Sequence, residues 1–365
     1  MNERKQKALI AMSGGVDSSV TAWLMQRAGY DCAGATMRLY RSTDLGEACH
    51  KTCCSQNDID DAGDVAFRLG MPFEVLEYTP LFREQVIERF CSAYEHGLTP
   101  NPCIDCNRYL KFDAFLEHAL REGFDVIATG HYARVERNAE TGRWQLRKAL
   151  DEGKDQSYVL YMLTQEQLGH LRLPLGALSK AETRRIAQEQ GFINARKHDS
   201  QDICFVPDGD YAAFLERWTG RETAEGELLD TEGKLIGHHR GALRYTLGQR
   251  RGLNFPAGER VYVVGKDMEK NTVTLGPESA LYRAELLAGR MNWLSIPEPS
   301  GPIRVTARTR YRQTERPALA TPLPGGRLRL VFDEPQRAIT PGQAVVLYDG
   351  DLVLGGGTIL AEGSI

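Results

Sequence analysis

Residues 8–19 read Ala8-Leu-Ile-Ala-Met-Ser-Gly-Gly-Val-Asp-Ser-Ser19 and decide the fold of this chain. The apolar run from Leu9 to Met12 predicts a short buried strand. A tight loop follows at 13–18, and the apolar residues beyond it recur at helical spacing up to Gly29. A strand that turns through glycines into a helix N-terminus gathers backbone N–H groups and partial positive charge. The stretch therefore predicts a site for an anion such as phosphate.

The loop S-G-G-V-D-S at 13–18 resembles the PP-loop of ATP pyrophosphatases. The Lys of a Walker A loop is absent, so a mononucleotide P-loop is not indicated, and an ordinary Gly-rich turn is the alternative. The resemblance implies that the loop holds the pyrophosphate of ATP while AMP passes to a substrate oxygen. Asp17 is expected to order Mg or the phosphates, although it also suits a helix N-cap. The expected ATP contacts are Ala11, Met12, Ser13, Gly14, Gly15, Val16, Asp17, Ser18, Met37 and Gly130.

Length and composition indicate an ordinary soluble protein of two or three domains. The chain has 365 residues, of which 42% are hydrophobic and 26% charged, and its formal net charge is −4. This charge argues against a generally basic nucleic-acid coat but leaves room for a local basic face. The charged N-terminus is not followed by a signal-peptide core, and no apolar run is long enough to span a bilayer. We therefore expect a cytoplasmic protein without a membrane partner.

Strand and helix patterns alternate through the N-terminal part of the chain. This alternation predicts an α/β fold with a parallel sheet covered on both faces, which binds ligands at the carboxyl ends of its strands. From about Asp208 the chain is Gly-rich with short β-like runs, and from about Leu281 short strands with Pro and Gly turns predict a compact barrel. The expected domains are a PP-loop catalytic domain of the adenine nucleotide alpha-hydrolase-like type at 1–207, a small connecting domain at 208–280 and a β-barrel at 281–365.

The eight cysteines are more typical of reactive or metal-binding thiols than of structural disulfides in such a chain. Cys103 and Cys106 form a C-x-x-C expected just before a helix, where a thiol pKa is lowered. Cys204 follows in D-I-C-F, and no second C-x-x-C supports a zinc site. Two further sets are expected to be less reactive: Cys49, Cys53 and Cys54 as loop thiols or a second metal cluster, and Cys32 and Cys91 as core residues.

Several ordered motifs closely resemble the tRNA-specific 2-thiouridylase family. They run from S-G-G-V-D-S at 13–18 through N-P-x-x-x-C-N at 101–107, T-G-H-Y at 129–132, K-D-Q-S-Y at 154–158, D-S-x-x-I-C-F at 199–205, Y-T-L-G-Q-R at 245–250 and T-R-Y-R-Q at 309–313 to P-G-Q at 341–343. The resemblance implies a tRNA-uridine 2-sulfurtransferase that uses ATP and Mg. Its implied substrate is the wobble uridine (position 34) of tRNA for Lys, Glu and Gln.

The implied mechanism has two chemical stages. Adenylation turns the poor leaving group at uridine O2 into a good one, with release of pyrophosphate, and activates C2 toward sulfur. By the resemblance, Cys204 carries the persulfide, Cys106 is the nucleophile, and a transient Cys106–Cys204 disulfide forms. A sulfur-donor protein, either a cysteine desulfurase or a sulfur-relay protein, is the implied partner beside tRNA.

Cys103 departs from the family pattern, because many members carry Asp there. Cys103, Cys106 and Cys204 therefore resemble the three-cysteine sites of related thiolases that hold a [4Fe–4S] cluster with one open iron. The plain persulfide route needs no metal, so this cluster stands as an alternative.

The segment from Ile303 to Arg312 predicts an RNA-facing surface. Read as one strand, it points Arg304, Arg308, Arg310 and Arg312 to the same side, which suits phosphate contacts. A solvated edge strand protected by charge is the alternative. The target uridine is expected to flip out of an open anticodon loop. By the family resemblance, tRNA and its target base are expected at Asn101, Pro102, Cys103, His131, Lys154, Asp155, Gln156, Arg310, Tyr311 and Gln343.

Other functions remain to be weighed against this one. Another PP-loop enzyme, such as an RNA 4-thiouridine or cytidine thiolase or an amide-forming ligase, shares the loop, but a ligase does not need Cys106 with Cys204. A non-catalytic redox or metal-sensing RNA-binding protein would use the C-x-x-C but not the loop. The sequence leaves open the exact tRNAs, the sulfur donor and the oligomeric state.

Overall fold

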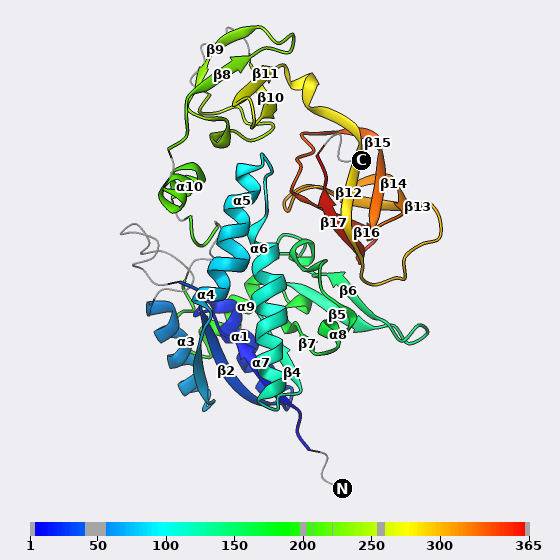
Figure 1. Ribbon diagram of the computed structural model, residues 1–365. Coiled ribbons are helices and arrows are strands. Elements are labelled where there is room, and N and C mark those ends of the chain that lie inside the picture. Colours follow the sequence, from blue (N-terminus) through cyan, green and yellow to red (C-terminus); the bar gives the residue numbers. More distant parts are fainter. Residues whose placement is uncertain are drawn as a thin grey trace.

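The computed structural model describes residues 4–40, 56–197, 203–206, 208–220, 222–253 and 260–361. Figure 1 shows three lobes: a parallel-sheet domain at the bottom, a small sheet at the top and a barrel at the right. Cys49, Cys53 and Cys54 lie outside the described residues, so their expected role stays a prediction. Within the described residues, no helix combines the length and apolar character needed to cross a bilayer.

The N-terminal sheet has five parallel strands in the order β3-β2-β1-β4-β7. Its central strand is β1, in which every residue after the first is buried. The predicted α/β fold with a parallel sheet is therefore confirmed. The strands are β1 Lys7–Ala11, β2 Asp31–Arg38, β3 Phe73–Glu77, β4 Val126–Ala128 and β7 Leu171–Arg172.

Alternating residues of β1 feed two separate cores. Leu9 and Ala11 pack with the helices near residues 106–121, whereas Ala8 and Ile10 pack with α1, α3 and α9. This follows from the two-residue period of a strand, and it places helices on both faces of the sheet. The helices are α1 Val16–Arg27, α3 Gln56–Arg68, α4 Thr79–Phe82, α5 Arg89–Glu95, α6 Pro102–Asp105, α7 Phe115–Arg121, α8 Gln165–Gly169 and α9 Lys180–Glu189.

Two long helical segments contain π-helical turns. The π-helix η1 Arg83–Glu88 joins α4 to α5, and the π-helix η2 Cys106–Ala114 joins α6 to α7. Such turns frequently occur at functional sites. The described chain also has three short 3₁₀ turns before the barrel junction: η3 Ser157–Leu160, η4 Pro174–Ala177 and η5 Ala242–Arg244.

The small upper lobe begins with α10 Tyr211–Thr219 and contains a four-stranded sheet in the order β10-β11-β8-β9. Leu228, Val263 and Val273 form its buried centre. The sheet of this lobe thus has its own core. Its strands are β8 Gly226–Leu229, β9 Leu235–His239, β10 Tyr262–Asp267 and β11 Thr272–Gly276.

The right-hand lobe is a closed barrel. It follows the 3₁₀ turn η6 Glu278–Leu281, and β12 pairs with both β15 and β17, so the strand order returns to its start. Several strands are longer than the short ones expected, because bulges let them bend around the barrel. The strands are β12 Tyr282–Trp293, β13 Ile303–Arg308, β14 Arg316–Leu323, β15 Arg327–Arg337, β16 Ala344–Asp349 and β17 Leu352–Ile359.

A hairpin from the first domain extends the barrel sheet, which the sequence did not predict. β5 Ala133–Arg137 and β6 Trp144–Lys148 pair with each other, and Arg147 of β6 pairs with Leu352 of β17. Arg134 also bonds Asp351 across this junction at 2.5 Å. The catalytic domain and the barrel are therefore joined by a shared sheet as well as by the chain.

Candidate active site

The nucleotide loop, defined as residues 13–18, comprises the turn after β1 and the first residues of α1, at the carboxyl edge of the sheet. Gly14 has φ +70°, and a Cβ there would lie 2.1 Å from the carbonyl oxygen of Asp58. Ser18 and Ser19 donate hydrogen bonds to the carbonyl of Gly15, each at 3.0 Å. Gly15 is the N-cap residue of α1 and provides no side-chain cap. The first-turn N–H groups are thus available to an anion at this edge.

Gly130 closes the loop from the neighbouring strand. A Cβ at Gly130 would lie 3.0 Å from the backbone carbonyl carbon of Asp17 and 3.0 Å from the backbone nitrogen of Ser18. Met12 directly follows β1 and is buried, and Met37 is partly buried at the end of β2. Met12, Met37, Gly130 and the loop therefore lie at the same edge of the sheet.

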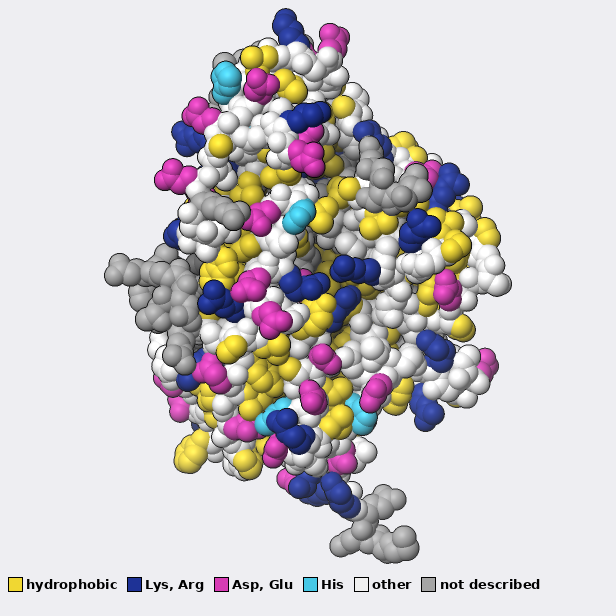
Figure 2. Space-filling model, in the orientation of Figure 1, with side chains coloured by type: hydrophobic (Ala, Val, Ile, Leu, Met, Phe, Trp, Pro, Cys, Tyr) yellow, Lys and Arg dark blue, Asp and Glu magenta, His cyan; other side chains and the backbone are white. Residues whose placement is uncertain are grey.

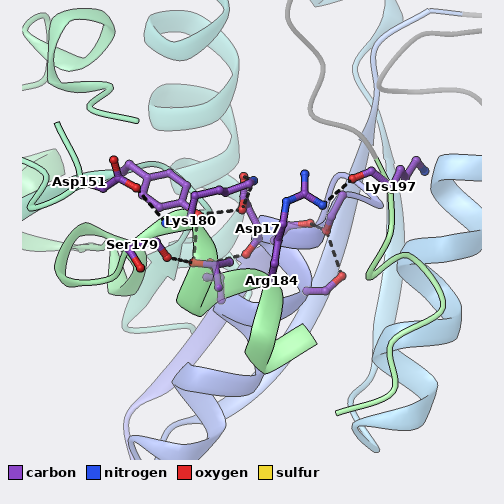
Figure 3. Close-up of polar contacts among 12 residues, drawn as sticks. Asp17, Asp151, Ser179, Lys180, Arg184 and Lys197 are labelled. Atoms are coloured by element: carbon purple, nitrogen blue, oxygen red, sulfur yellow. Dashed lines mark hydrogen bonds and ion pairs between the residues drawn. The ribbon is translucent and has the colours of Figure 1, made fainter. Parts of the chain in front are cut away.

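Asp17 is held by residues that the sequence analysis did not select. Its carboxylate accepts hydrogen bonds from Lys180 Nζ at 2.7 and 2.8 Å and from the Tyr132 hydroxyl at 3.0 Å. Figure 3 shows Lys180 reaching Asp17 from the start of α9. Since Gly15 is the N-cap, the alternative role of Asp17 as a cap is wrong. Lys180 brings a positive charge to the loop, where the phosphates of ATP would carry negative charge.

A second basic residue, Lys197, contacts the loop. Lys197 Nζ donates to the Gly14 carbonyl at 3.2 Å and contacts the carboxylates of Asp58 and Asp61 at 2.5 and 2.7 Å. Burial lowers the pKa of Lys197, but the two carboxylates outweigh this and raise it. Arg184 donates to the Lys197 carbonyl at 3.1 Å, as Figure 3 shows. The Ser179 capping box was the available signal for Lys180, whereas no local pattern marks Lys197.

The thiol cluster is defined as Cys106 and Cys204 with the rings of Phe82, Phe90, Phe205 and Phe214, which pack into one core. Cys106 is 8% exposed, and Cys204 packs against the same buried core although it lies far along the chain. Phe205 makes edge-on contacts with Phe82 and Phe90, with ring centroids 5.7 and 5.2 Å apart. Leu39 and Tyr40, which follow β2, belong to this core. The cluster therefore lies at the carboxyl edge of the sheet that also carries the loop.

The C-x-x-C does not precede a helix but opens one. Pro102 starts α6, and Asn101 caps it by accepting the backbone N–H of Cys103 at 3.1 Å. Cys103 is exposed, and Cys106 begins η2 one turn later. The expected position just before a helix is therefore corrected to the first turns of one. The described cysteines are thiols, and burial raises the pKa of Cys32 to about 11 and of Cys91 to about 12, as suits core residues.

The iron–sulfur alternative is not supported by the structure. In the part of the chain that the structure describes, no three His, Cys, Asp or Glu side chains gather in a way that would hold a metal ion. Cys103 is exposed and Cys106 is buried.

Several residues expected at tRNA instead connect the catalytic domain to the barrel. Asp155 is buried and accepts hydrogen bonds from Ala149, Ser157 and Arg308. Gln343 donates to the Thr99 carbonyl at 2.8 Å. These contacts show an interface between domains, and the expected RNA contacts at these residues stay predictions.

The remaining expected tRNA residues have varied surroundings. His131 is buried beside Thr129, with Nδ1 and Oγ1 2.8 Å apart, and burial keeps its pKa well below the usual value. Gln156 accepts the Tyr132 N–H at 2.9 Å, and Lys154 follows Asp151 in the same turn. Tyr311 packs beside Tyr158, with ring centroids 6.0 Å apart. Pro102 is buried at the start of α6.

The expected ladder of arginines is wrong. β13 ends at Arg308, so Arg310 and Arg312 lie in the turn after it. Arg304 pairs with Asp333, and Arg308 pairs with Asp155 and Glu315. The edge-strand alternative is also wrong, because β13 lies between β14 and β16. Figure 2 shows basic and acidic side chains interspersed on the visible face, with several basic ones near its middle.

Comparison with known proteins matches all three lobes. A family model described as the tRNA methyl transferase HUP domain matches residues 6–208. The tRNA methyl transferase PRC-barrel domain matches 212–277, and the aminomethyltransferase beta-barrel domain matches 283–359. The fold and its loop thus define a nucleotide-binding PP-loop protein of the HUP class that carries a PRC-barrel and a β-barrel.

Full-length relatives define the family further. The chain is 47% identical over 356 residues to a tRNA-specific 2-thiouridylase MnmA of Acetivibrio thermocellus, covering 97% of this chain and 99% of that protein. It is 50% identical over 351 residues to the Moorella thermoacetica protein of the same name, covering 96% and 98%. The chain belongs to the tRNA-specific 2-thiouridylase MnmA family, which confirms the resemblance noted from its motifs.

Proposed function

We propose that this protein is a tRNA-uridine 2-sulfurtransferase that converts the wobble uridine (position 34) of tRNA for Lys, Glu and Gln to 2-thiouridine. The observation that carries the proposal is the common location of the nucleotide loop and the thiol cluster at one edge of the sheet. An enzyme that activates a base with ATP and then delivers sulfur needs both groups within reach of the same atom.

The nucleotide loop supports the first stage. ATP, taken as its Mg complex, would place its phosphates at the first turn of α1, near Lys180. Donors held in place by the fold stabilise negative charge that develops on departing pyrophosphate. Uridine O2 would attack the α-phosphorus, so that AMP becomes bonded to O2 and pyrophosphate leaves. The phosphates themselves can provide most oxygen ligands of Mg.

The thiol cluster supports the second stage. A sulfur-donor protein would leave a persulfide on Cys204, whose terminal sulfur attacks C2 and displaces AMP. Cys106 would then attack the Cys204 sulfur, which releases 2-thiouridine and leaves a Cys106–Cys204 disulfide. The apolar rings around the two thiols exclude water that would otherwise hydrolyse the activated base. A reductant must restore both thiols before the next cycle.

A methyl transfer, which the HUP description names, fits the site less well. Sulfur insertion gives a role to Cys106 and Cys204, two thiols that share one buried core. Methyl transfer to RNA would give no role to these two thiols or to a loop that binds ATP.

Nucleoside mass spectrometry tests the proposal directly. Unmodified tRNA for Glu, Lys or Gln is incubated with the protein, ATP, Mg and a persulfide donor, with and without prior iron chelation. The proposal expects wobble 2-thiouridine and one pyrophosphate for each modified base in both samples. No 2-thiouridine in either sample, with a donor shown to be active, would return the choice to other PP-loop enzymes.

A further inference from the structure

The three thiols near the candidate site differ in their access to solvent. Cys103 is exposed, Cys204 is half-buried and Cys106 is 8% exposed. Cys106 and Cys204 lie among phenylalanine rings, whereas Cys103 lies at the surface on the preceding helical turn. A reductant the size of a protein therefore meets Cys103 before it meets the other two.

The geometry connects Cys103 to Cys106. The two residues are three apart on a continuous helical segment that runs from α6 into η2. That spacing separates their Cα atoms by about 5 Å in an α-helix. Disulfides form over Cα separations of roughly 4.4–6.8 Å, so a Cys103–Cys106 bridge needs little movement. Cys106 and Cys204 also pack into the same core, so the segments that carry these two thiols lie together in the fold.

The turn that leads to Cys103 contacts the barrel, because Gln343 donates to the Thr99 carbonyl at 2.8 Å and the Thr99 N–H donates to the Pro341 carbonyl at 2.9 Å. Burial, Asp155 and the Cys103 thiolate together raise the pKa of Tyr311, which places Cys103 within electrostatic range of that ring. Tyr311 lies in the turn after β13. The thiol therefore lies where the catalytic domain and barrel meet, outside the aromatic core.

We propose that Cys103 is a third catalytic thiol, which resets the enzyme after each sulfur transfer. This inference rests on the proposed function. The Cys103 thiolate attacks the Cys106 sulfur of the Cys106–Cys204 disulfide, forming a Cys103–Cys106 disulfide and releasing Cys204 as a thiolate that takes up a proton. An external dithiol then supplies two electrons and two protons to reduce the Cys103–Cys106 bridge. Cys204 becomes ready for a new persulfide while the reductant acts at the surface.

The test compares single and multiple turnover in wild type and Cys103→Ser. Single turnover uses excess protein loaded with persulfide, and multiple turnover uses excess tRNA with a protein dithiol reductant. For each protein, the multiple-turnover rate is divided by the single-turnover yield. We expect this ratio to be at least tenfold lower in Cys103→Ser than in wild type. Cys32→Ala is the matched control, because that thiol lies in the opposite core and should leave this ratio at the wild-type value.

Disulfide mapping gives a readout that a structural role would not change. Trypsin cleavage after Lys197 and Arg217 leaves Cys204 in a peptide without another cysteine, while the peptide 90–108 holds Cys103 and Cys106 together with Cys91. Fragmentation of that peptide shows which two of its three cysteines are bridged. After one turnover, wild type should contain the internal Cys103–Cys106 bridge, and Cys103→Ser should accumulate the cross-linked Cys106–Cys204 peptides.

The outcomes separate the two proposals. Wild-type 2-thiouridine with an unchanged Cys103→Ser ratio, or without a Cys103–Cys106 bridge, would overturn the resetting role alone. Loss of single-turnover product on iron chelation would show that the thiols act as metal ligands and would also overturn it. No wild-type 2-thiouridine, with an active donor, would remove the proposed function and this inference together.

Discussion

The nucleotide loop and the thiol cluster lie at one edge of the same sheet but are built differently. The loop is one short stretch of chain between β1 and α1, and charged side chains such as Lys180 and Lys197 hold it. The thiol cluster joins Cys106 to Cys204 from distant segments through aromatic contacts. Likewise, Asp155 and Arg308 connect distant segments, of the catalytic domain and of the barrel. The first region follows from local sequence, whereas the second depends on the assembled fold.

Removing a thiol should have the largest effect, and it should change the function of the thiol cluster without changing that of the nucleotide loop. Cys106→Ser or Cys204→Ser should each lower 2-thiouridine formation by about 10³-fold or more, because a serine oxygen cannot carry or exchange the sulfur. ATP affinity should stay at the wild-type value, since neither thiol contributes to the loop. Nucleoside mass spectrometry and equilibrium ATP binding measure the two effects. Retained thiolation in either variant would contradict the two-thiol scheme.

The second largest effect is expected at the interface between the catalytic domain and the barrel. Asp155→Ala removes a carboxylate that is 1% exposed and leaves Arg308, which is 16% exposed, with one fewer partner. Breaking a buried ion pair in this way costs about 3–5 kcal/mol. Denaturant unfolding of the full chain measures the loss. Arg304→Ala is the control, because its pair with Asp333 is exposed and should give no measurable change. Equal effects would show that the buried pair does not hold the barrel.

The loop itself offers the smallest and most local change. Gly14→Ala would force a methyl group to within 2.1 Å of the Asp58 carbonyl at a positive φ, whereas the Cβ of Gly15→Ala would lie 3.5 Å from the Ser13 hydroxyl. We expect Gly14→Ala to cost about 2–3 kcal/mol of stability and to weaken ATP binding. Thermal unfolding of both variants tests this. Equal stability of the two would mean that the first turn of α3, which contains Asp58, shifts easily.

Features that depend on residues close together in the chain could be predicted from the sequence. The strand–loop–helix predicted from residues 8–19 occurs in the structure, as β1, the nucleotide loop and α1. Periodicity and capping are local, so they survive in any fold that uses the segment.

What the sequence did not predict depends on partners far along the chain. The arginines near 304–312 looked like a basic ladder because nothing nearby reveals that Arg308 meets Asp155. The β5–β6 hairpin carries no sign that it completes a barrel sheet. Lys197 was missed for the same reason, because its acidic partners lie on α3.

The shared sheet has a consequence for synthesis on the ribosome. Arg134 of the hairpin bonds Asp351, which lies 217 residues later. At roughly 5–20 residues per second, the hairpin waits about 10–40 s for the strand that it joins. During that time the catalytic domain carries an unpaired strand edge, a surface that invites pairing with other chains. The nascent protein is therefore most vulnerable to aggregation after its nucleotide loop exists and before its last strand emerges.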